Sequence, residues 1–233
     1  MANRKTIMKR SGLLFILVPL TMTVSMAQEE KGVEVSLTSG VVVPSTPMAF
    51  ANYWTMHYGG GVRVGFPLTQ SVTFVGSFEY YRFKLNEAGV RDAFAIDYMR
   101  DIWVFNSVSL SPSADPSSIV SLSANVCIAP ASISAAVSPY FVAGMGVMRF
   151  SMRDVATPTM SVLSIDNTNI AMIAESRIVG GKETAGLIQG GVGINLAVIG
   201  SVNAFVEARY TLGLTKGQRT SYIPLNIGVK IQL

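Results

Sequence analysis

The carboxyl-terminal segment YIPLNIGVKIQL alternates between apolar and polar residues up to its last position. The odd positions from Leu225 to Leu233 are apolar, and the positions between them are polar or glycine. An extended strand places alternate side chains on opposite faces, so this segment has one apolar and one polar face. In lipid, a strand at the end of a chain must still pair its backbone groups, and it does so when a sheet closes into a barrel. We therefore expect a closed, membrane-spanning β-barrel in which the last strand meets the first.

Seven further segments show the same alternation, which predicts eight strands in total. In one of them, Leu122 and Val126 share a face opposite Ser123 and Asn125. The expected strands span about residues 33–43, 58–68, 71–84, 117–128, 137–150, 184–196, 203–214 and 222–233. Such strands are long enough to cross a bilayer at the usual tilt. The expected fold class is all-β, an eight-stranded antiparallel up-and-down transmembrane barrel.

The expected connections alternate between short and long. Short turns join strands two and three, four and five, and six and seven, whereas the longest connections are residues 85–116 and 151–183. Bacterial outer-membrane barrels combine short periplasmic turns with longer outside loops and an even number of strands. Within 85–116, the segment DIWVFNSVSL at 101–110 would either extend the fourth strand or form an inserted hairpin.

The first 27 residues are typical of a secretory signal peptide. Arg4, Lys5, Lys9 and Arg10 precede an apolar run that begins at Leu13, and Ser25-Met26-Ala27 offers small residues for cleavage before Gln28. The expected barrel domain is therefore residues 28–233. Without the four basic residues of this leader, 14 basic residues face 14 acidic ones, so the basic pI of the whole chain does not favour a nucleic-acid partner.

The composition favours a protein whose outer surface faces lipid. The chain is 49% hydrophobic and 14% charged, where roughly 25% charged is usual in a soluble protein. A helical membrane protein is one alternative, because residues 116–148 and 184–206 carry no formal charge. Pro130, Pro139 and the period-two pattern with many glycines and serines argue against helices. A soluble secreted barrel is the other alternative, although its apolar exterior would have to be covered.

The segments PYFVAGMGVMRF, GLIQGGVGINL, NAFVEARYTLG and YIPLNIGVKIQL resemble the small OmpA-like, eight-stranded outer-membrane β-barrel family. The resemblance covers residues 136–233 well and the first half of the chain by pattern. It implies the barrel architecture but no one role, since the family includes adhesins, structural proteins and narrow channels. The chain ends in Leu233 rather than in the aromatic residue common in such barrels.

The inward faces of the expected strands bring six charged side chains into the lumen. An eight-stranded barrel is just wide enough for side chains to fill its interior, so unpaired charge there would be costly. We expect Glu34 to approach Lys230 where the first and last strands meet, and Glu207 and Arg209 to meet Arg63 and Glu79 at mid-height. A static polar plug is the favoured interpretation of this network, and a gated ion path is the alternative. The predicted lumen charge network is Glu34, Arg63, Glu79, Glu207, Arg209 and Lys230.

Aromatic residues near the outer ends of the strands predict an aromatic girdle at the membrane boundary. Its expected members are Trp54, Tyr58, Tyr80, Trp103, Tyr210 and Tyr222. Tyr53, Tyr81 and Phe83 lie in the same regions of the sequence.

No residue pattern predicts catalysis, a cofactor or a metal ion. The one histidine, His57, has no evident Ser or Asp partner nearby in the sequence, so a loop or interfacial position is expected. Cys127, the one cysteine, is expected to face inward as an inert small residue. The glycine clusters at 59–61 and 190–193 lack the Lys-Ser/Thr of a P-loop and are expected to relieve crowding.

We therefore expect a non-enzymatic outer-membrane barrel with a closed polar lumen and a structural or surface-interaction role. The expected partners are outer-membrane lipid and lipopolysaccharide, and a surface ligand bound by the loops 44–57, 85–116, 151–183 and 215–221. A monomer is expected. A narrow channel for ions or small solutes is the alternative function, and a lipid-modifying enzyme with His57 at the rim is the third.

Overall fold

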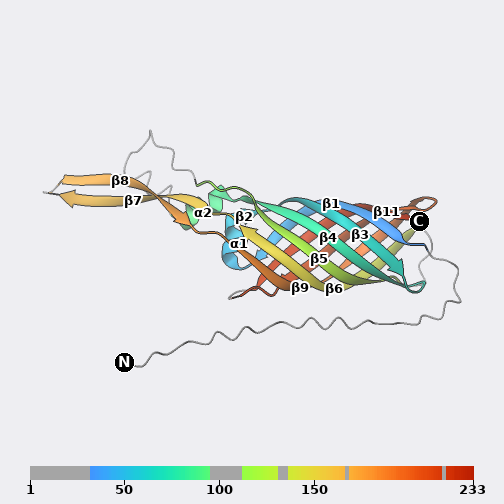
Figure 1. The fold of residues 1–233 in the computed structure, drawn as a ribbon. Coiled ribbons are helices and arrows are strands. Elements are labelled where there is room, and N and C mark those ends of the chain that lie inside the picture. The colour runs from blue at the N-terminus through green and yellow to red at the C-terminus, as the bar shows by residue number, and fades with distance from the viewer. Residues whose placement is uncertain (1–31, 95–111, 131–135, 166–167, 217–218) are drawn as a thin grey trace, which may run out of the picture. The chain divides into compact units, whose positions relative to one another are not determined.

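The computed structural model describes residues 32–94, 112–130, 136–165, 168–216 and 219–233. In this part of the chain eight long antiparallel strands form one closed sheet (Figure 1). The sheet closes because β4 pairs with both β3 and β5. The eight strands are β1 (Glu34–Thr46), β3 (His57–Pro67), β4 (Val72–Leu85), β5 (Ser117–Ile128), β6 (Val137–Met152), β9 (Gly181–Ile199), β10 (Val202–Gly213) and β11 (Thr220–Gln232). The predicted eight-stranded antiparallel barrel is confirmed, whereas residues 1–31, including the predicted signal peptide, lie outside the described residues.

The last strand pairs with the first over the whole length of both. Leu37 pairs with Val229, and Val41 pairs with Leu225, so the alternating carboxyl-terminal segment completes the cylinder. We refer to this β1–β11 pairing as the seam. It satisfies the backbone groups that an open edge would leave exposed to lipid.

The register of the strands defines how steeply they tilt. A row of paired residues that leaves β1 at Glu34 returns to β1 at Pro44, ten residues further along. The row passes through Gly65, Val75, Asn125, Gly144, Gln189, Thr211 and Tyr222. With a rise of about 3.3 Å per residue and strands about 4.8 Å apart, this offset tilts the strands by roughly 40° from the barrel axis.

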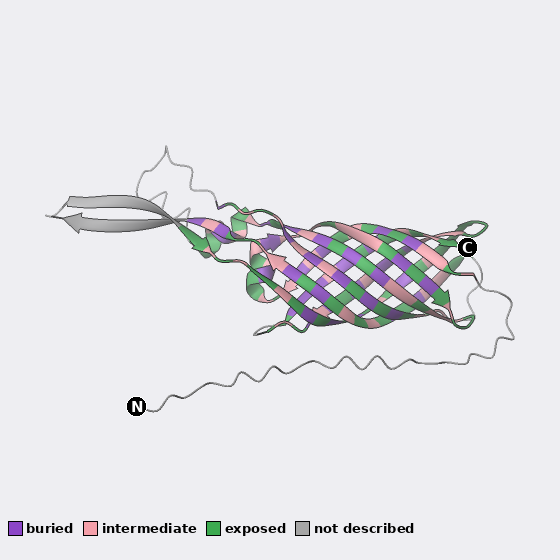
Figure 2. Ribbon diagram, viewed as in Figure 1, coloured by how far each residue is buried: buried purple, intermediate pink, exposed green. Residues whose placement is uncertain are grey.

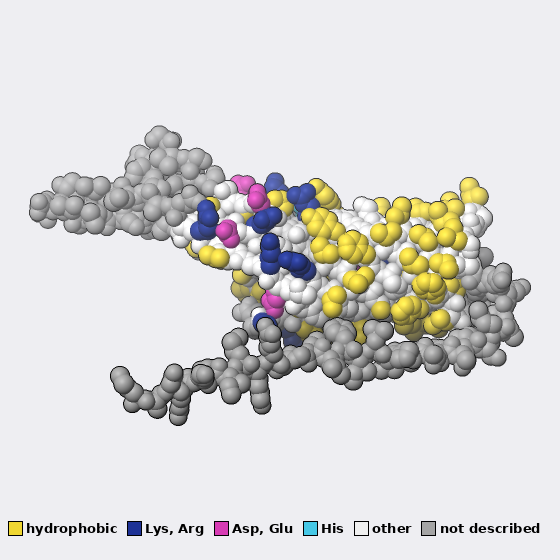
Figure 3. All heavy atoms as spheres, in the orientation of Figure 1, with side chains coloured by type: hydrophobic (Ala, Val, Ile, Leu, Met, Phe, Trp, Pro, Cys, Tyr) yellow, Lys and Arg dark blue, Asp and Glu magenta, His cyan; other side chains and the backbone are white. Residues whose placement is uncertain are grey.

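Buried and exposed residues alternate along every strand of the barrel (Figure 2). On β11, for example, Ile227 and Val229 are exposed while Asn226 is buried. The lumen therefore holds the polar side chains, and the outer wall holds the apolar ones, which form a broad apolar surface in Figure 3. This inverted distribution is the one that a hydrocarbon surrounding requires.

The two ends of the barrel differ. The short links at residues 68–71 and 200–201, together with the end of β5 and the start of β6, lie at the end that also holds the carboxyl terminus, which we call the short-turn end (Figure 1). The opposite, long-loop end carries the helices α1 (Met48–Tyr53) and α2 (Glu87–Ala93) and the two-residue strand β2 (Trp54–Thr55). The connection between β6 and β9 contains two more strands, β7 (Val155–Ile165) and β8 (Thr168–Ile178), which pair with each other.

These added elements refine the predicted loops. Residues 44–57, 85–116 and 151–183 are the expected loops, and they contain short helices and a β-hairpin; Phe50 of α1 and Val90 of α2 are buried against the barrel mouth. The segment 101–110, whose structure was left open, lies outside the described residues.

An aromatic and aliphatic core fills the barrel at the long-loop end. Phe50 of α1 packs edge-on against Phe83 and Phe150, with ring centroids 4.9 and 5.3 Å apart. We call this core the apolar plug. Its buried members are Val42, Phe50, Trp54, Tyr81, Phe83, Leu85, Val90, Ile119, Met148, Phe150, Val155, Leu187 and Tyr222. None of the helices in the described residues has the length and apolar character needed to span a bilayer.

Candidate functional site in the barrel lumen

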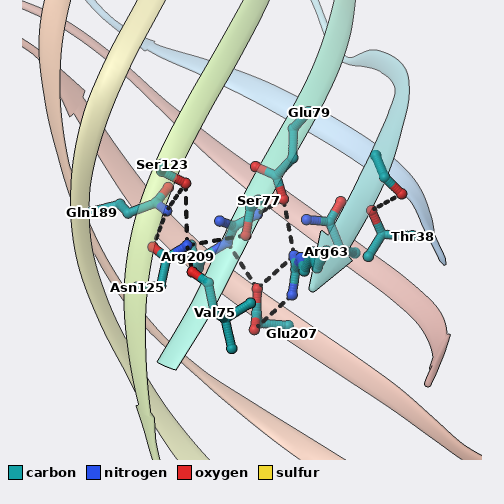
Figure 4. Close-up of polar contacts among 12 residues, drawn as sticks. Thr38, Arg63, Val75, Ser77, Glu79, Ser123, Asn125, Gln189, Glu207 and Arg209 are labelled. Carbon is teal, nitrogen blue, oxygen red and sulfur yellow. Dashed lines mark hydrogen bonds and ion pairs between the residues drawn. The ribbon is translucent and has the colours of Figure 1, made fainter. Parts of the chain in front are cut away.

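Four charged side chains meet in the lumen and form a closed network, which we call the charge cluster (Figure 4). Arg63 of β3 reaches both acids: its Nη2 lies 3.0 Å from Glu79 Oε1 and 2.9 Å from Glu207 Oε1. Arg209 of β10 also reaches both, with its Nη2 bound to Glu79 Oε1 and its Nε 2.8 Å from Glu207 Oε1. Each guanidinium therefore contacts both carboxylates, and each carboxylate contacts both guanidiniums.

The charge cluster is almost completely shielded from solvent. The side chains of Glu207 and Arg209 are each 1% exposed, that of Glu79 is 3% exposed and that of Arg63 is 7% exposed. Burial makes an unpaired charge expensive, and these two cations and two anions balance. The cluster is thus stable only as a complete set.

Two of the four ion pairs of the cluster, Arg63–Glu207 and Arg209–Glu79, cross the seam. Arg63 and Glu79 lie on β3 and β4, whereas Glu207 and Arg209 lie on β10. In the sheet, β1 and β11 stand between β3 and β10. The side chains reach across the lumen over these two strands, so they join the two halves of the barrel on either side of the seam.

Aromatic side chains surround the charge cluster. The Tyr140 hydroxyl donates a hydrogen bond of 2.8 Å to Glu207 Oε2, and the Phe205 ring lies 5.3 Å from Arg63 Cζ. Tyr81 links the cluster to β11, because it accepts a hydrogen bond of 3.0 Å from Asn226 Nδ2. These contacts hold the guanidinium and carboxylate groups in position.

Glycines make room for contacts between side chains two strands apart. Gly193 pairs with Tyr140 on one side and with Glu207 on the other, so Tyr140 reaches Glu207 by passing over a residue without a side chain. A Cβ atom placed on Gly193 would overlap the Tyr140 ring. Gly144 has the same role between Asn125 and Gln189. This is the relief of crowding that was expected of the glycine cluster at 190–193.

A second polar layer lies beside the charge cluster, toward β5 and β9. Asn125 Nδ2 donates to Ser77 Oγ at 3.0 Å and to Ser123 Oγ at 3.1 Å. Gln189 Nε2 donates to Ser123 Oγ at 3.1 Å and also to Asn125 Oδ1. Uncharged amides and hydroxyls thus fill the lumen where the charged side chains do not reach (Figure 4).

A cavity of about 220 Å³ lies on the short-turn side of the charge cluster. Arg63, Glu207, Tyr140 and Phe205 line it on the cluster side, and the lone cysteine, Cys127, also lines it. The lumen therefore has three zones: the apolar plug, the polar middle and a polar cavity toward the short turns.

The remaining predicted charges, Glu34 and Lys230, form a separate ion pair. Lys230 Nζ lies 3.3 Å from Glu34 Oε2, and both residues line the cavity. The Glu34 side chain is 16% exposed and the Lys230 side chain is 20% exposed, so this pair is more accessible to solvent than the charge cluster. The structure thus brings all six predicted lumen residues into contact as two sets.

The predicted aromatic girdle needs a correction. Tyr58, Tyr80 and Tyr210 point outward and are 54%, 42% and 47% exposed, as membrane-boundary residues should be. Trp54 and Tyr222, at 2% and 1% exposed, belong to the apolar plug instead, because they point into the barrel mouth. Tyr81 and Phe83 are also inside it, and Trp103 lies outside the described residues.

His57 begins β3 at the long-loop end. Its ring lies 4.1 Å from the ring of Tyr58, and in the described part of the chain no hydrogen bond joins it to a carboxylate or hydroxyl side chain. Among the same residues, no three His, Cys, Asp or Glu side chains lie close enough together to hold a metal ion.

Several lumen residues were not singled out from the sequence as site residues. Tyr140, Tyr81, Asn125 and Gln189 complete the polar middle. For Asn125 and Gln189 the signal was present, because both lie on the predicted inward faces. Tyr140 also lies on a predicted inward face, next to the outward Phe141, but its contact with Glu207 carries no sequence signal because it depends on the glycine between them.

The closed sheet of eight tilted strands, apolar outside and polar inside, is the fold of the small eight-stranded outer-membrane β-barrel proteins. Neisserial surface protein A has this fold: it matches 87% of this chain and 97% of its own length at 13% sequence identity, with a TM-score of 0.51.

Two other solved structures match with lower TM-scores. A major outer membrane protein from Thermus thermophilus covers 87% of this chain and all of its own length at 11% identity and a TM-score of 0.49. The attachment invasion locus protein Ail of Yersinia pestis covers 86% of this chain and 99% of its own length at 11% identity and a TM-score of 0.44. No protein-family model matches the chain, and no curated protein matches its sequence.

Proposed function

We propose that this chain is an integral outer-membrane protein with a closed lumen, which acts structurally or through surface interactions of its long-loop end. The observation that carries the proposal is the charge cluster, whose four side chains join β3, β4 and β10 across the lumen. The net charge of the network is zero only while all four side chains stay together. The network therefore resists opening of the lumen, because separating a pair leaves a buried charge without its partner.

The apolar plug supports the same function. It closes the long-loop end with packed rings and aliphatic side chains, including Phe50, Phe83 and Phe150. A packed core made mainly of rings and aliphatic side chains is a poor path for ions, since it offers few groups to replace their water shell. The long-loop end is then free to present α2 and the β7–β8 hairpin to the surroundings.

Membrane fractionation tests the location, and electrophoresis with and without boiling tests the barrel. We expect the protein in the outer-membrane fraction, with an unboiled form that migrates faster than the boiled one. Recovery of the processed chain as a dissolved periplasmic or secreted protein would contradict the proposal.

A narrow channel is the second candidate, and the cavity of about 220 Å³ favours it. The cavity is polar and would form one half of a pore if the charge cluster rearranged. Discrete conductance steps in a planar bilayer containing the purified protein would favour this function over the closed barrel. No current at physiological voltages would favour the closed barrel.

A further inference from the structure

On the face of the barrel shown in Figure 3, positively charged side chains gather at the edge of the apolar surface. Arg82 of β4 points outward because its neighbours Tyr81 and Phe83 are buried in the lumen. Arg149 of β6 points outward between Met148 and Phe150 for the same reason.

Arg82 and Arg149 stand at the same level of the barrel. Arg82 pairs with Ser118 of β5, and Ser118 pairs with Ser151, which is two residues beyond Arg149 on β6. Because the strands tilt by roughly 40°, the row rises by about 6 Å toward the long-loop end between Arg82 on β4 and Ser151 on β6. Going back along β6 from Ser151 to Arg149 lowers the position by about 5 Å. The two side chains therefore start within about 1 Å of the same height and about 12 Å apart around the wall.

This level lies just above the outward-facing tyrosines. Arg82 Nη1 donates a hydrogen bond of 3.4 Å to the Tyr58 hydroxyl, and Tyr80 lies two residues below Arg82 on the same strand. Tyrosines of this kind mark the boundary between hydrocarbon and head groups. The two arginines are thus placed at the depth of lipid head groups, directly over the apolar wall.

The positive charge here has no acidic partner among the residues that the structure describes. In the described residues, neither Arg82, Arg149 nor the neighbouring Lys84 forms an ion pair with a carboxylate. At the corresponding ends of β1, β10 and β11, the outward positions hold the uncharged residues Val43, Leu212 and Ile223. On the wall itself, Arg82, Lys84 and Arg149 therefore place positive charge on the β4–β6 side, whereas β1, β10 and β11 carry none at this level.

We propose that Arg82 and Arg149, with Lys84 above them, bind the phosphate groups of a lipid A-type glycolipid in the outer leaflet. Guanidinium groups bind phosphate with two parallel hydrogen bonds, and two such groups at one depth suit a lipid that carries two phosphates. The acyl chains would lie on the apolar wall below, which includes Phe78, Leu122 and Val147. This inference rests on the proposed outer-membrane location, because that membrane supplies the lipid.

The test measures binding of bisphosphorylated and monophosphorylated lipid A to the purified, folded barrel in uncharged detergent micelles. The variant is Arg82→Gln with Arg149→Gln. The control is Lys216→Gln with Arg219→Gln, which removes two exposed positive charges from the β10–β11 loop. We expect the first variant to bind bisphosphorylated lipid A at least about tenfold more weakly, and the control to bind within about twofold of the original protein.

The inference would be overturned if the double arginine variant bound the lipid as tightly as the original protein, or if the loop control lost as much affinity as that variant. Displacement of the lipid by millimolar inorganic phosphate would also overturn it, because it would indicate a free-phosphate site. Faster migration of the unboiled variants is the check that they fold. Because binding is measured on the isolated barrel, its failure is distinct from failure of the proposed location, which fractionation tests.

Discussion

Lys230 Nζ and Glu34 Oε2 lie 3.3 Å apart across the seam, where Lys230 pairs with Ser36 and Glu34 pairs with Gln232. This ion pair is diagonal in the sheet and borders the polar cavity. The charge cluster further along the lumen also pairs cations with carboxylates, but with guanidinium groups and in a far less accessible setting. The two sites therefore allow the effect of burial on an ion pair to be compared within one barrel.

Replacing Lys230 by Gln should change stability little. The pair with Glu34 is partly accessible, and accessible ion pairs contribute about 0–1 kcal/mol. Urea unfolding in lipid vesicles measures the change in the free energy of unfolding. A loss much greater than about 1 kcal/mol would show that this pair behaves like a buried one.

Replacing Arg209 by Ala should be far more damaging. The substitution leaves Glu79 and Glu207 with only Arg63 as a counter-charge in a buried site. Removing one partner of a buried ion pair typically costs about 3–5 kcal/mol. The same unfolding measurement, with Lys230→Gln as control, gives the change, and a planar bilayer reports any ion leakage. If the variant unfolded like the original protein and also remained silent, the charge cluster would not be the element that closes the lumen.

Replacing Gly193 by Ala should disturb the contact between Tyr140 and Glu207. The new methyl group overlaps the Tyr140 ring, which must move away from the carboxylate. We expect a loss of about 1–3 kcal/mol in unfolding free energy from overpacking. Gly190→Ala is the matched control on the same strand, since a Cβ there faces outward and lies 3.8 Å from its nearest neighbour, Val142 O. Equal effects of the two substitutions would disprove the packing argument.

Replacing Phe50 by Ala should weaken the apolar plug without opening the lumen. A buried phenylalanine changed to alanine typically costs about 3–5 kcal/mol, because transfer energy is lost and a cavity is left. The charge cluster remains intact, so conductance in a planar bilayer should stay absent. Steady current through this variant would mean that the plug alone closes the barrel.

The Cys127 thiol should react only with reagents that arrive from the short-turn end. It lines the cavity on that side of the charge cluster, together with Ser71 and Ala129 of the short links. The measurement uses a charged, membrane-impermeant maleimide and vesicles that hold the barrel in one orientation. The control is Ser113→Cys in a Cys127→Ala background, because Ser113 is exposed at the long-loop end. Labelling of Cys127 from the long-loop side would show a path through the whole lumen.

The barrel could be predicted from the sequence because lipid on one side and a polar lumen on the other impose a strict alternation. The six charged lumen residues followed from the same alternation. Pairing was then expected because an eight-stranded barrel leaves no room for a charge to remain alone. The contacts within each set depend on strand register, which alternation alone does not supply.

The girdle prediction was wrong for Tyr222 and Trp54 because nearness to a strand end does not say which face a side chain occupies. Tyr222 shares its parity with the inward-facing Asn226, so the pattern contained the correction. Trp54 lies in a two-residue strand, where no alternation can be read. The helices α1 and α2 are too short for a helical period to be recognised, and their formation depends on packing against the barrel mouth.

The ion pairs that cross the seam also constrain how the chain folds. Arg63 and Glu207 are 144 positions apart in the sequence, and Arg209 and Glu79 are 130 apart. Because they lie on opposite sides of the seam, they can meet only when β1 and β11 come together, which makes them among the last contacts to form. Until then each guanidinium has only one carboxylate within reach: Glu79 for Arg63, on the neighbouring strand, and Glu207 for Arg209, on the same strand. Closing the seam gives each guanidinium its second carboxylate, so the cluster favours the completed cylinder over partly assembled forms.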